Sequence, residues 1–168
     1  MKQYKNRNEV EEKYKWDLSE YYKNDDEFFA SYKKLDKELD ILKEYVGCTT
    51  DADKLYDYLE KETNFDAEIE KIYIYAAIRN DEVLGQEVPL DMLNKASLLI
   101  TKFSNLTAFF NPELLKLTSA SYEQLFTLNK KLKDYKPYLD DIYRYKDHVL
   151  NEEEEKIEIG RASCRERV

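Results

Sequence analysis

The sequence contains few of the residues that usually build a catalytic or metal centre. It has one histidine, His148, with two cysteines and one tryptophan among its 168 residues. A hydrolytic zinc site takes about three protein ligands and commonly draws two histidines from an H-E-x-x-H helix, which a single histidine cannot provide. The Glu-x-x-His pairs of di-iron bundles are missing too, since Tyr145 stands three residues before His148. We therefore expect no catalytic residue, cofactor site or metal site within this chain.

Long apolar runs are also absent. No run approaches the roughly 18 residues of a transmembrane helix, and the N-terminus, MKQYKNRNEVEEKYK, lacks the apolar stretch of a signal peptide. Cys48 is the only cysteine before the C-terminal tail, so it has no partner for an internal disulfide and suits a reducing compartment. These features predict a cytoplasmic protein with no membrane partner.

Basic residues are outnumbered by acidic ones, 27 against 36, which gives a net charge of −9. An excess of carboxylates repels the phosphate backbone of nucleic acids instead of releasing its counterions. Nucleic acid is therefore not an expected partner.

Glycine and proline, three residues each, are scarce and fall mainly between periodic segments. Helix-breaking residues spaced in this way are typical of long helices. No segment alternates strictly between apolar and polar residues over the length of a strand. The predicted fold is all-α, an antiparallel bundle of about six to seven helices.

The first expected helix has apolar residues at steps of three and four from Phe28 to Val46, with Asp25 or Asp26 as N-cap and Gly47 at its end. A second is expected from TTDADK, with Thr50 or Asp51 as N-cap, to the ETNF segment, and a third from DAEIEK onward. Further helices are expected after the break at residues 85–89, from FFNPELL with its asparagine as N-cap, within SASYEQLFTLNKKLKDY, and from KPYLDD onward.

Three features allow both a functional and a structural interpretation. His148 could be a general base, but at the end of an amphipathic helix a packing or capping role is favoured. The 15 tyrosines could line a peptide groove, although their helical spacing favours the rim of a core. Glu152 to Glu155 could suggest a cation site, but four consecutive side chains point around a helix, so a solvated first turn capped by Asn151 is favoured.

The last stretch, EIGRASCRERV, differs in composition from the body, since it holds three of the six arginines. Translated back into codons, it matches a common sequencing adapter read in frame. We interpret residues 158–168 as an adapter artefact and leave them out of the functional reasoning.

Four passages occur in this order in the sequence: KWDLSEYYKNDDEF, IEKIYIYAAIRNDEV, FFNPELL and YRYKDHVLNEEEEKI. Together they resemble the N-terminal region of the oligoendopeptidase F family of zinc metallopeptidases, and the likeness spans residues 7–157. The resemblance implies an N-terminal extended segment at residues 1–23 and a helical oligopeptidase F N-terminal domain at residues 24–157, so that the chain would be a truncated part of a larger α-helical peptidase. Asn151 stands where the family commonly has serine, which keeps a capping oxygen.

The resemblance also implies a function for the longer protein. In such enzymes the helical region helps to wall a channel that admits short peptides, and the zinc and its H-E-x-x-H helix belong to a separate catalytic lobe. This fragment would then be catalytically inactive, and the missing C-terminal lobe would be its partner. Residues expected to contact that lobe are Trp16, Tyr21, Tyr22, Tyr143 and Tyr145. The alternative is a free-standing acidic helical module for protein–protein interaction.

Overall fold

The computed structural model describes residues 9–82 and 85–148. Within these ranges there are six α-helices, several short 3-10 helices and no strand, so the predicted all-α fold is confirmed. The chain divides into two compact units, one ending at Phe110 and the other beginning at Asn111. A division at this point was not predicted. The boundary expected at residue 157 and the tail of residues 158–168 lie outside the described ranges.

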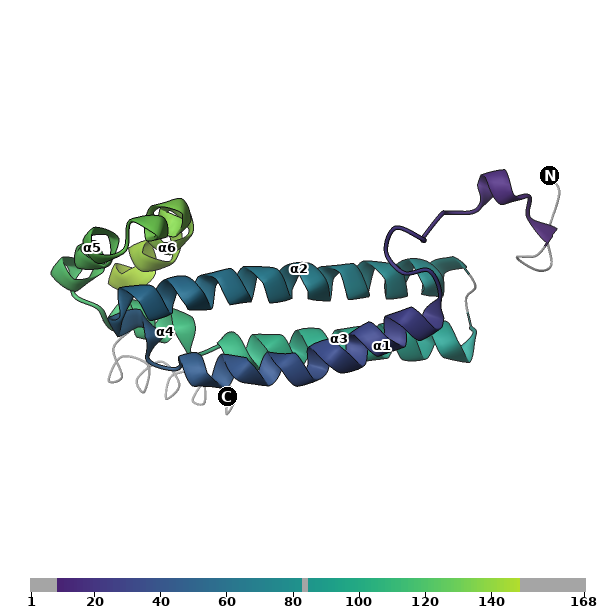
Figure 1. Cartoon of the computed structure of the whole chain (residues 1–168), viewed down its shortest axis with the longest axis horizontal. Helices are drawn as coiled ribbons and strands as arrows, with labels where there is room; N and C mark the ends of the chain where they lie inside the picture. Colours follow the sequence, from purple (N-terminus) through teal and green to yellow (C-terminus); the bar gives the residue numbers. More distant parts are fainter. Residues whose placement is uncertain (1–8, 83–84, 149–168) are drawn as a thin grey trace, which may run out of the picture. The chain divides into compact units, whose positions relative to one another are not determined.

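The first unit is built on a long helical hairpin. Helix α2 (Ala52–Glu82) and helix α3 (Glu87–Thr107) pack along each other, and helix α1 (Asp25–Glu38) with the 3-10 helix η3 (Leu39–Tyr45) lies against both (Figure 1). Gly85, just before α3, has a φ of +84°, in the left-handed region that favours glycine. The core of this unit lies between the three helical segments.

Helix α1 is shorter than predicted and is capped by a different residue. The Asn24 side chain accepts a hydrogen bond from the Glu27 amide at 2.9 Å, so Asn24 is the N-cap in place of Asp25 or Asp26. After Glu38 the chain tightens into η3, whose buried residues are Leu39, Leu42 and Tyr45. Their spacing of three matches the period of a 3-10 helix. The prediction that Val46 would join this apolar face is wrong, because its side chain is 57% exposed.

The helix break expected near ETNF does not occur, and α2 runs through it for 31 residues. Neither glycine nor proline lies in that segment, and the Asn64 side-chain amide donates to the Glu60 carbonyl without opening the helix. Of the two predicted N-caps, Thr50 and Asp51, it is Asp51 that caps the helix, since its carboxylate accepts hydrogen bonds from the amides of Asp53 and Lys54. At about 1.5 Å per residue, α2 is about 47 Å long.

Two aromatic clusters stabilise the hairpin unit. In one, the Tyr22 ring meets Phe28 and Tyr75 edge to face, with centroids 5.8 and 5.2 Å apart. In the other, the fully buried Tyr58 ring contacts Tyr45 and Phe110. Such ring pairs add to the free energy gained from burying their area.

The second unit contains most of helix α4 (Phe110–Lys116), then helix α5 (Ser119–Leu128), the 3-10 helix η5 (Lys130–Tyr135), helix α6 (Lys136–Tyr143) and the 3-10 helix η6 (Arg144–His148). Helix α4 begins at Phe110, one residue before the predicted N-cap. Proline stands in the first turn of α6, as predicted. The Tyr122 ring stacks on Tyr143 at 4.2 Å, and its hydroxyl donates to Asp140 at 2.7 Å, so α5 and α6 are held together.

Candidate functional site

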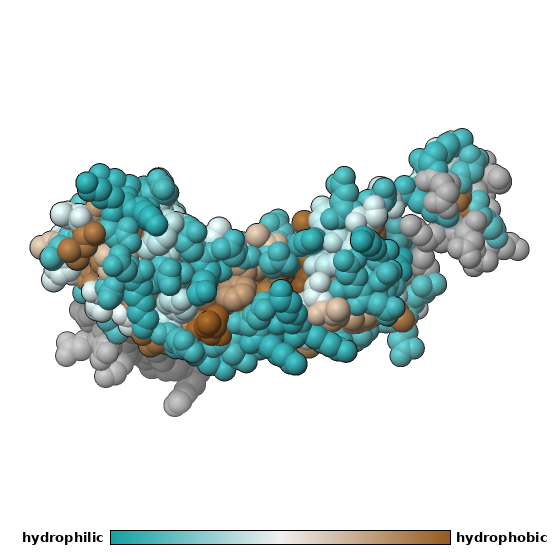
Figure 2. Space-filling view, in the orientation of Figure 1, coloured by the Kyte–Doolittle hydropathy of each residue, from teal (hydrophilic) through white to brown (hydrophobic). Residues whose placement is uncertain are grey.

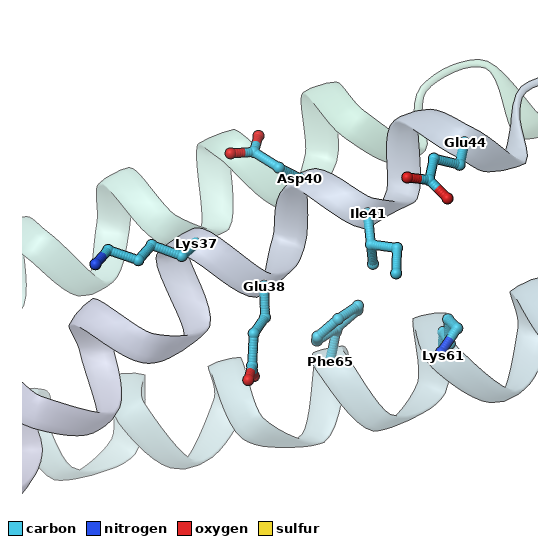
Figure 3. Close-up of a pocket in the computed structure, with 7 residues that line it drawn as sticks. All are labelled: Lys37, Glu38, Asp40, Ile41, Glu44, Lys61 and Phe65. Atoms are coloured by element: carbon cyan, nitrogen blue, oxygen red, sulfur yellow. The ribbon is translucent and has the colours of Figure 1, made fainter.

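An open hollow of ≈ 620 Å³ lies in the first unit, between the end of α1, η3 and the middle of α2. Figure 3 shows its two apolar side chains, Ile41 from η3 and Phe65 from α2, pointing toward each other. Ile41 is 39% exposed. The hollow therefore offers an apolar floor that solvent and a ligand can reach.

Charged side chains surround this floor. They are Lys37, Glu38, Asp40, Glu44 and Lys61. Asp40 is paired with Lys43 at 2.7 Å, and this hydrogen bond is the main cause that holds the pKa of Asp40 below its usual value. Such an arrangement can bind an apolar side chain while the rim pairs with charged or polar groups. It contains no paired nucleophile and base, so it is suited to binding and not to bond cleavage.

A partly buried carboxylate lies near the hollow on α2. Burial raises the pKa of Glu62, and the neighbouring charge of Asp66 adds to the effect. A raised pKa can mark a general acid. Here the shift comes from burial beside a second carboxylate without a nucleophile, so it does not by itself indicate catalysis.

The described part of the chain holds no group of three or more histidine, cysteine, aspartate or glutamate residues that could bind a metal ion. The zinc implied by the resemblance does not fit these residues. Cys48 is fully buried in the first unit. The side chain of His148 and the residues Glu152 to Glu155 lie outside what the structure describes.

The five residues expected to contact a missing lobe differ in their surroundings. Trp16 is 61% exposed and Tyr145 is 54% exposed, so both rings are open to a partner. Tyr21 is half-buried. Tyr22 is only 5% exposed, because it packs in the core of its own unit. Its ring has little surface left for another domain.

Tyr143 likewise contacts residues of its own unit. Its ring stacks on Tyr122, and its hydroxyl donates to the Leu117 carbonyl at 2.8 Å, while the Lys146 ammonium binds the same carbonyl. It is half-buried. Trp16, Tyr21 and Tyr22 belong to the first unit, and Tyr143 and Tyr145 belong to the second. Their contact with a lobe stays a prediction.

Sequence reasoning missed the hollow. Ile41 precedes Leu42 of the predicted apolar face, and Phe65 fell at a helix end that does not exist. An uninterrupted α2 would have placed Phe65 on the helix surface, where an aromatic residue among charged neighbours is a usable signal.

Comparison with known proteins gives consistent matches. The family model described as Oligopeptidase F matches residues 113–158. The plasmid-encoded oligoendopeptidase F of Lactococcus lactis subsp. cremoris is 34% identical over 155 residues, covering 91% of this chain and 26% of the relative. Oligopeptidase PepF of Bacillus subtilis is 27% identical over 152 residues, covering 90% of this chain and 23% of the relative. This chain is an N-terminal region of the oligoendopeptidase F family.

The chain spans about a quarter of the length of these relatives. A crystal structure of a protein classed as a peptidase from Chlamydophila abortus matches with a TM-score of 0.76, covering 94% of this chain and 27% of that one. At 20% identity this match supports the fold alone. The predicted resemblance is confirmed, and so is the prediction that the chain is part of a larger helical protein.

No helix among the described residues of this oligoendopeptidase F region has the length and apolarity that a membrane crossing requires.

Proposed function

We propose that this chain forms part of the peptide-channel wall of a cytoplasmic zinc oligoendopeptidase, and that the rest of the protein supplies the zinc site and the chemistry. The observation that carries the proposal is the match over 91% of the chain to an oligoendopeptidase F of which it covers 26%. Short peptides are the substrates of the proposed enzyme.

The hollow on α2 supports a role in binding. Ile41 and Phe65 provide an apolar contact, and carboxylates and ammonium groups surround them. A peptide has apolar side chains and two charged ends, which are the groups that such a surface can contact. We place the hollow on the wall of the proposed channel.

A chimera tests the proposal. The matched N-terminal part of the Lactococcus lactis oligoendopeptidase F is replaced by residues 7–157 of this chain. We expect the chimera to cleave a short internally quenched peptide and to lose this activity when zinc is chelated. The isolated chain should cleave no peptide and bind no stoichiometric zinc. Chelator-sensitive cleavage by the isolated chain would contradict the division of roles.

Two variants of the chimera test the wall itself. Phe65→Ala should raise KM for the short peptide by about threefold or more with little change in kcat, because it removes binding common to the ground and transition states. Tyr73→Ala is the control, since Tyr73 is on the same helix, is 41% exposed and does not line the hollow. Equal KM values for the two variants would argue against the wall role. Peptide binding by the isolated chain, with an inactive chimera, would favour the interaction module.

A further inference from the structure

The outer face of α3 differs in composition from the rest of the hairpin unit. The helix buries Pro89, Met92, Ala96 and Leu99 on its inner face. The opposite side carries a row of exposed, uncharged residues that we call the α3 outer face: Leu90, Asn94, Ser97, Leu98, Thr101, Ser104, Asn105 and Ala108. Glu87 precedes this row in the first turn, and the partly exposed Asp91–Lys95 ion pair borders it. Leu90 is 50% exposed and Leu98 is 64% exposed.

The neighbouring helices show how unusual this face is. Seven residues of α1 are exposed and six of them are charged, and α2 exposes twelve residues of which eight are charged. Helix α3 exposes ten residues, and Glu87 in its first turn is the single charged one. A face that remains in water would be expected to resemble those of α1 and α2. On the side of the molecule in Figure 2, hydrophilic surface prevails and the hydrophobic patches are small and scattered.

Two of the polar groups on the α3 outer face, the hydroxyls of Ser97 and Thr101, are suited to being covered. The Ser97 hydroxyl donates to the Leu93 carbonyl at 3.0 Å, and the Thr101 hydroxyl donates to the Ser97 carbonyl at 3.0 Å. These donors already have partners within the helix, so a covering surface would not leave them unsatisfied. The short side chains would let a second helix approach to about 8–10 Å between axes. Cores of protein interfaces are likewise depleted of charge.

We propose that the α3 outer face is the surface on which the remainder of the same peptidase chain docks. This inference rests on the proposed function, in which the chain continues into a catalytic lobe. The matched relatives have about three quarters of their length outside the aligned region, which supplies a covalently linked occupant. A linked lobe is present at a high effective concentration, so a partly polar interface is sufficient. A second copy of this chain would need a more apolar face to form a stable dimer.

Cysteine labelling tests the proposal with a minimal change of shape. Ser97→Cys on the α3 outer face is compared with Thr63→Cys, an exposed position on α2. Each variant is made in the isolated chain with Cys164→Ser and in the Lactococcus chimera, and maleimide labelling at each site is read by mass spectrometry. We expect labelling at position 97 to be about tenfold slower or more in the chimera than in the isolated chain, while position 63 changes by less than about twofold.

Equal labelling rates at position 97 in the two proteins would overturn the proposal, as would equal slowing at positions 97 and 63. Slowing at position 97 that grows with the concentration of the isolated chain would identify a second copy as the occupant and would also overturn it. If the chimera is not monodisperse, the separately made Lactococcus remainder is titrated into the isolated chain, and unchanged labelling at saturation refutes the docking. Peptide cleavage is scored separately: protection at position 97 in an inactive chimera supports the docking and contradicts the proposed function.

Discussion

Replacing Asp25 with alanine tests how much the contact between the N-terminal end of α1 and the C-terminal end of α2 stabilises the fold. The Asp25 carboxylate accepts from the Arg79 guanidinium at 3.1 Å from Nε and 2.9 Å from the second terminal nitrogen, and from the Tyr75 hydroxyl at 3.0 Å. The guanidinium also donates to Glu82 at 3.0 Å. The substitution therefore removes the link between the helices without leaving Arg79 unpaired.

The expected decrease in the free energy of unfolding depends on how deeply the ion pair between Asp25 and Arg79 is buried. The side chains of Asp25 and Arg79 are 31% and 25% exposed. Breaking a fully buried pair costs about 3–5 kcal/mol, whereas an exposed pair contributes about 0–1 kcal/mol. Allowing for solvent screening, we expect Asp25→Ala to lower the free energy of unfolding by about 2 kcal/mol. That corresponds to a decrease in Tm of about 4–8 °C for a chain of this size.

Asp26→Ala is the matched control, because Asp26 is exposed and lies in the same first turn of α1. Both variants lose a carboxylate that interacts with the helix dipole, worth about 0.3–1 kcal/mol. The measurement is urea unfolding followed by circular dichroism at 222 nm. If the two variants differ by less than about 0.5 kcal/mol, which is within ordinary surface effects, the reasoning is refuted.

The effect should also depend on pH. Hydrogen bonding to the Arg79 guanidinium is the main cause that holds the pKa of Asp25 below its usual value. A carboxylate with a lowered pKa stabilises the fold above its unfolded pKa of about 3.9, and this stability is lost as the pH falls through the folded value. The difference between the natural chain and Asp25→Ala should therefore persist from pH 7 to about pH 4 and narrow below it. If the difference in the free energy of unfolding between the two proteins stays constant into strong acid, the ion pair between Asp25 and Arg79 is not the cause of that difference.

Three further outcomes are expected. Leu99→Ala, at a fully buried position, should lower the free energy of unfolding measured in urea by about 2–5 kcal/mol. Leu98→Ala, at the adjacent side chain that is 64% exposed, should change it by less than about 0.5 kcal/mol. Similar losses for the two variants would contradict the orientation of α3. Trp16 fluorescence should be red-shifted and readily quenched in the isolated chain, and blue and protected in the Lactococcus chimera if Trp16 contacts the lobe; identical spectra would remove it from the interface. Deleting residues 158–168 should leave Tm unchanged, and a marked loss would contradict the adapter interpretation.

The helical fold could be predicted because its signals are local. Apolar residues at steps of three and four define the buried face of α3, and the scarcity of glycine and proline leaves few possible ends. Asp51 was identified as a cap because its side chain can reach the free amides that follow it. In each case the deciding interactions lie within about one helical turn.

The errors occurred where distant packing decides the local structure. Leu39, Leu42 and Tyr45 are buried together because η3 packs against both α2 and α3, and a 3-10 helix, with three residues per turn, aligns residues three apart on one side. The hollow at Ile41 and Phe65 depends on the same contact between segments more than 20 residues apart. Neither periodicity nor propensity reports on such a contact.

Tyr22 and Trp16 show where sequence alone cannot choose. Both are aromatic residues before the first regular helix, and the sequence suggested one role for both. The structure buries the Tyr22 ring against Phe28 and Tyr75 but leaves Trp16 61% exposed. Which aromatic residue enters the core depends on the reach of the chain from Asn24, where α1 is capped. Charge is a better guide to the outer surface. Helices α1 and α2 expose many charged residues, whereas α3 exposes a single one, Glu87 in its first turn, and this difference is the observation on which the proposed docking surface rests.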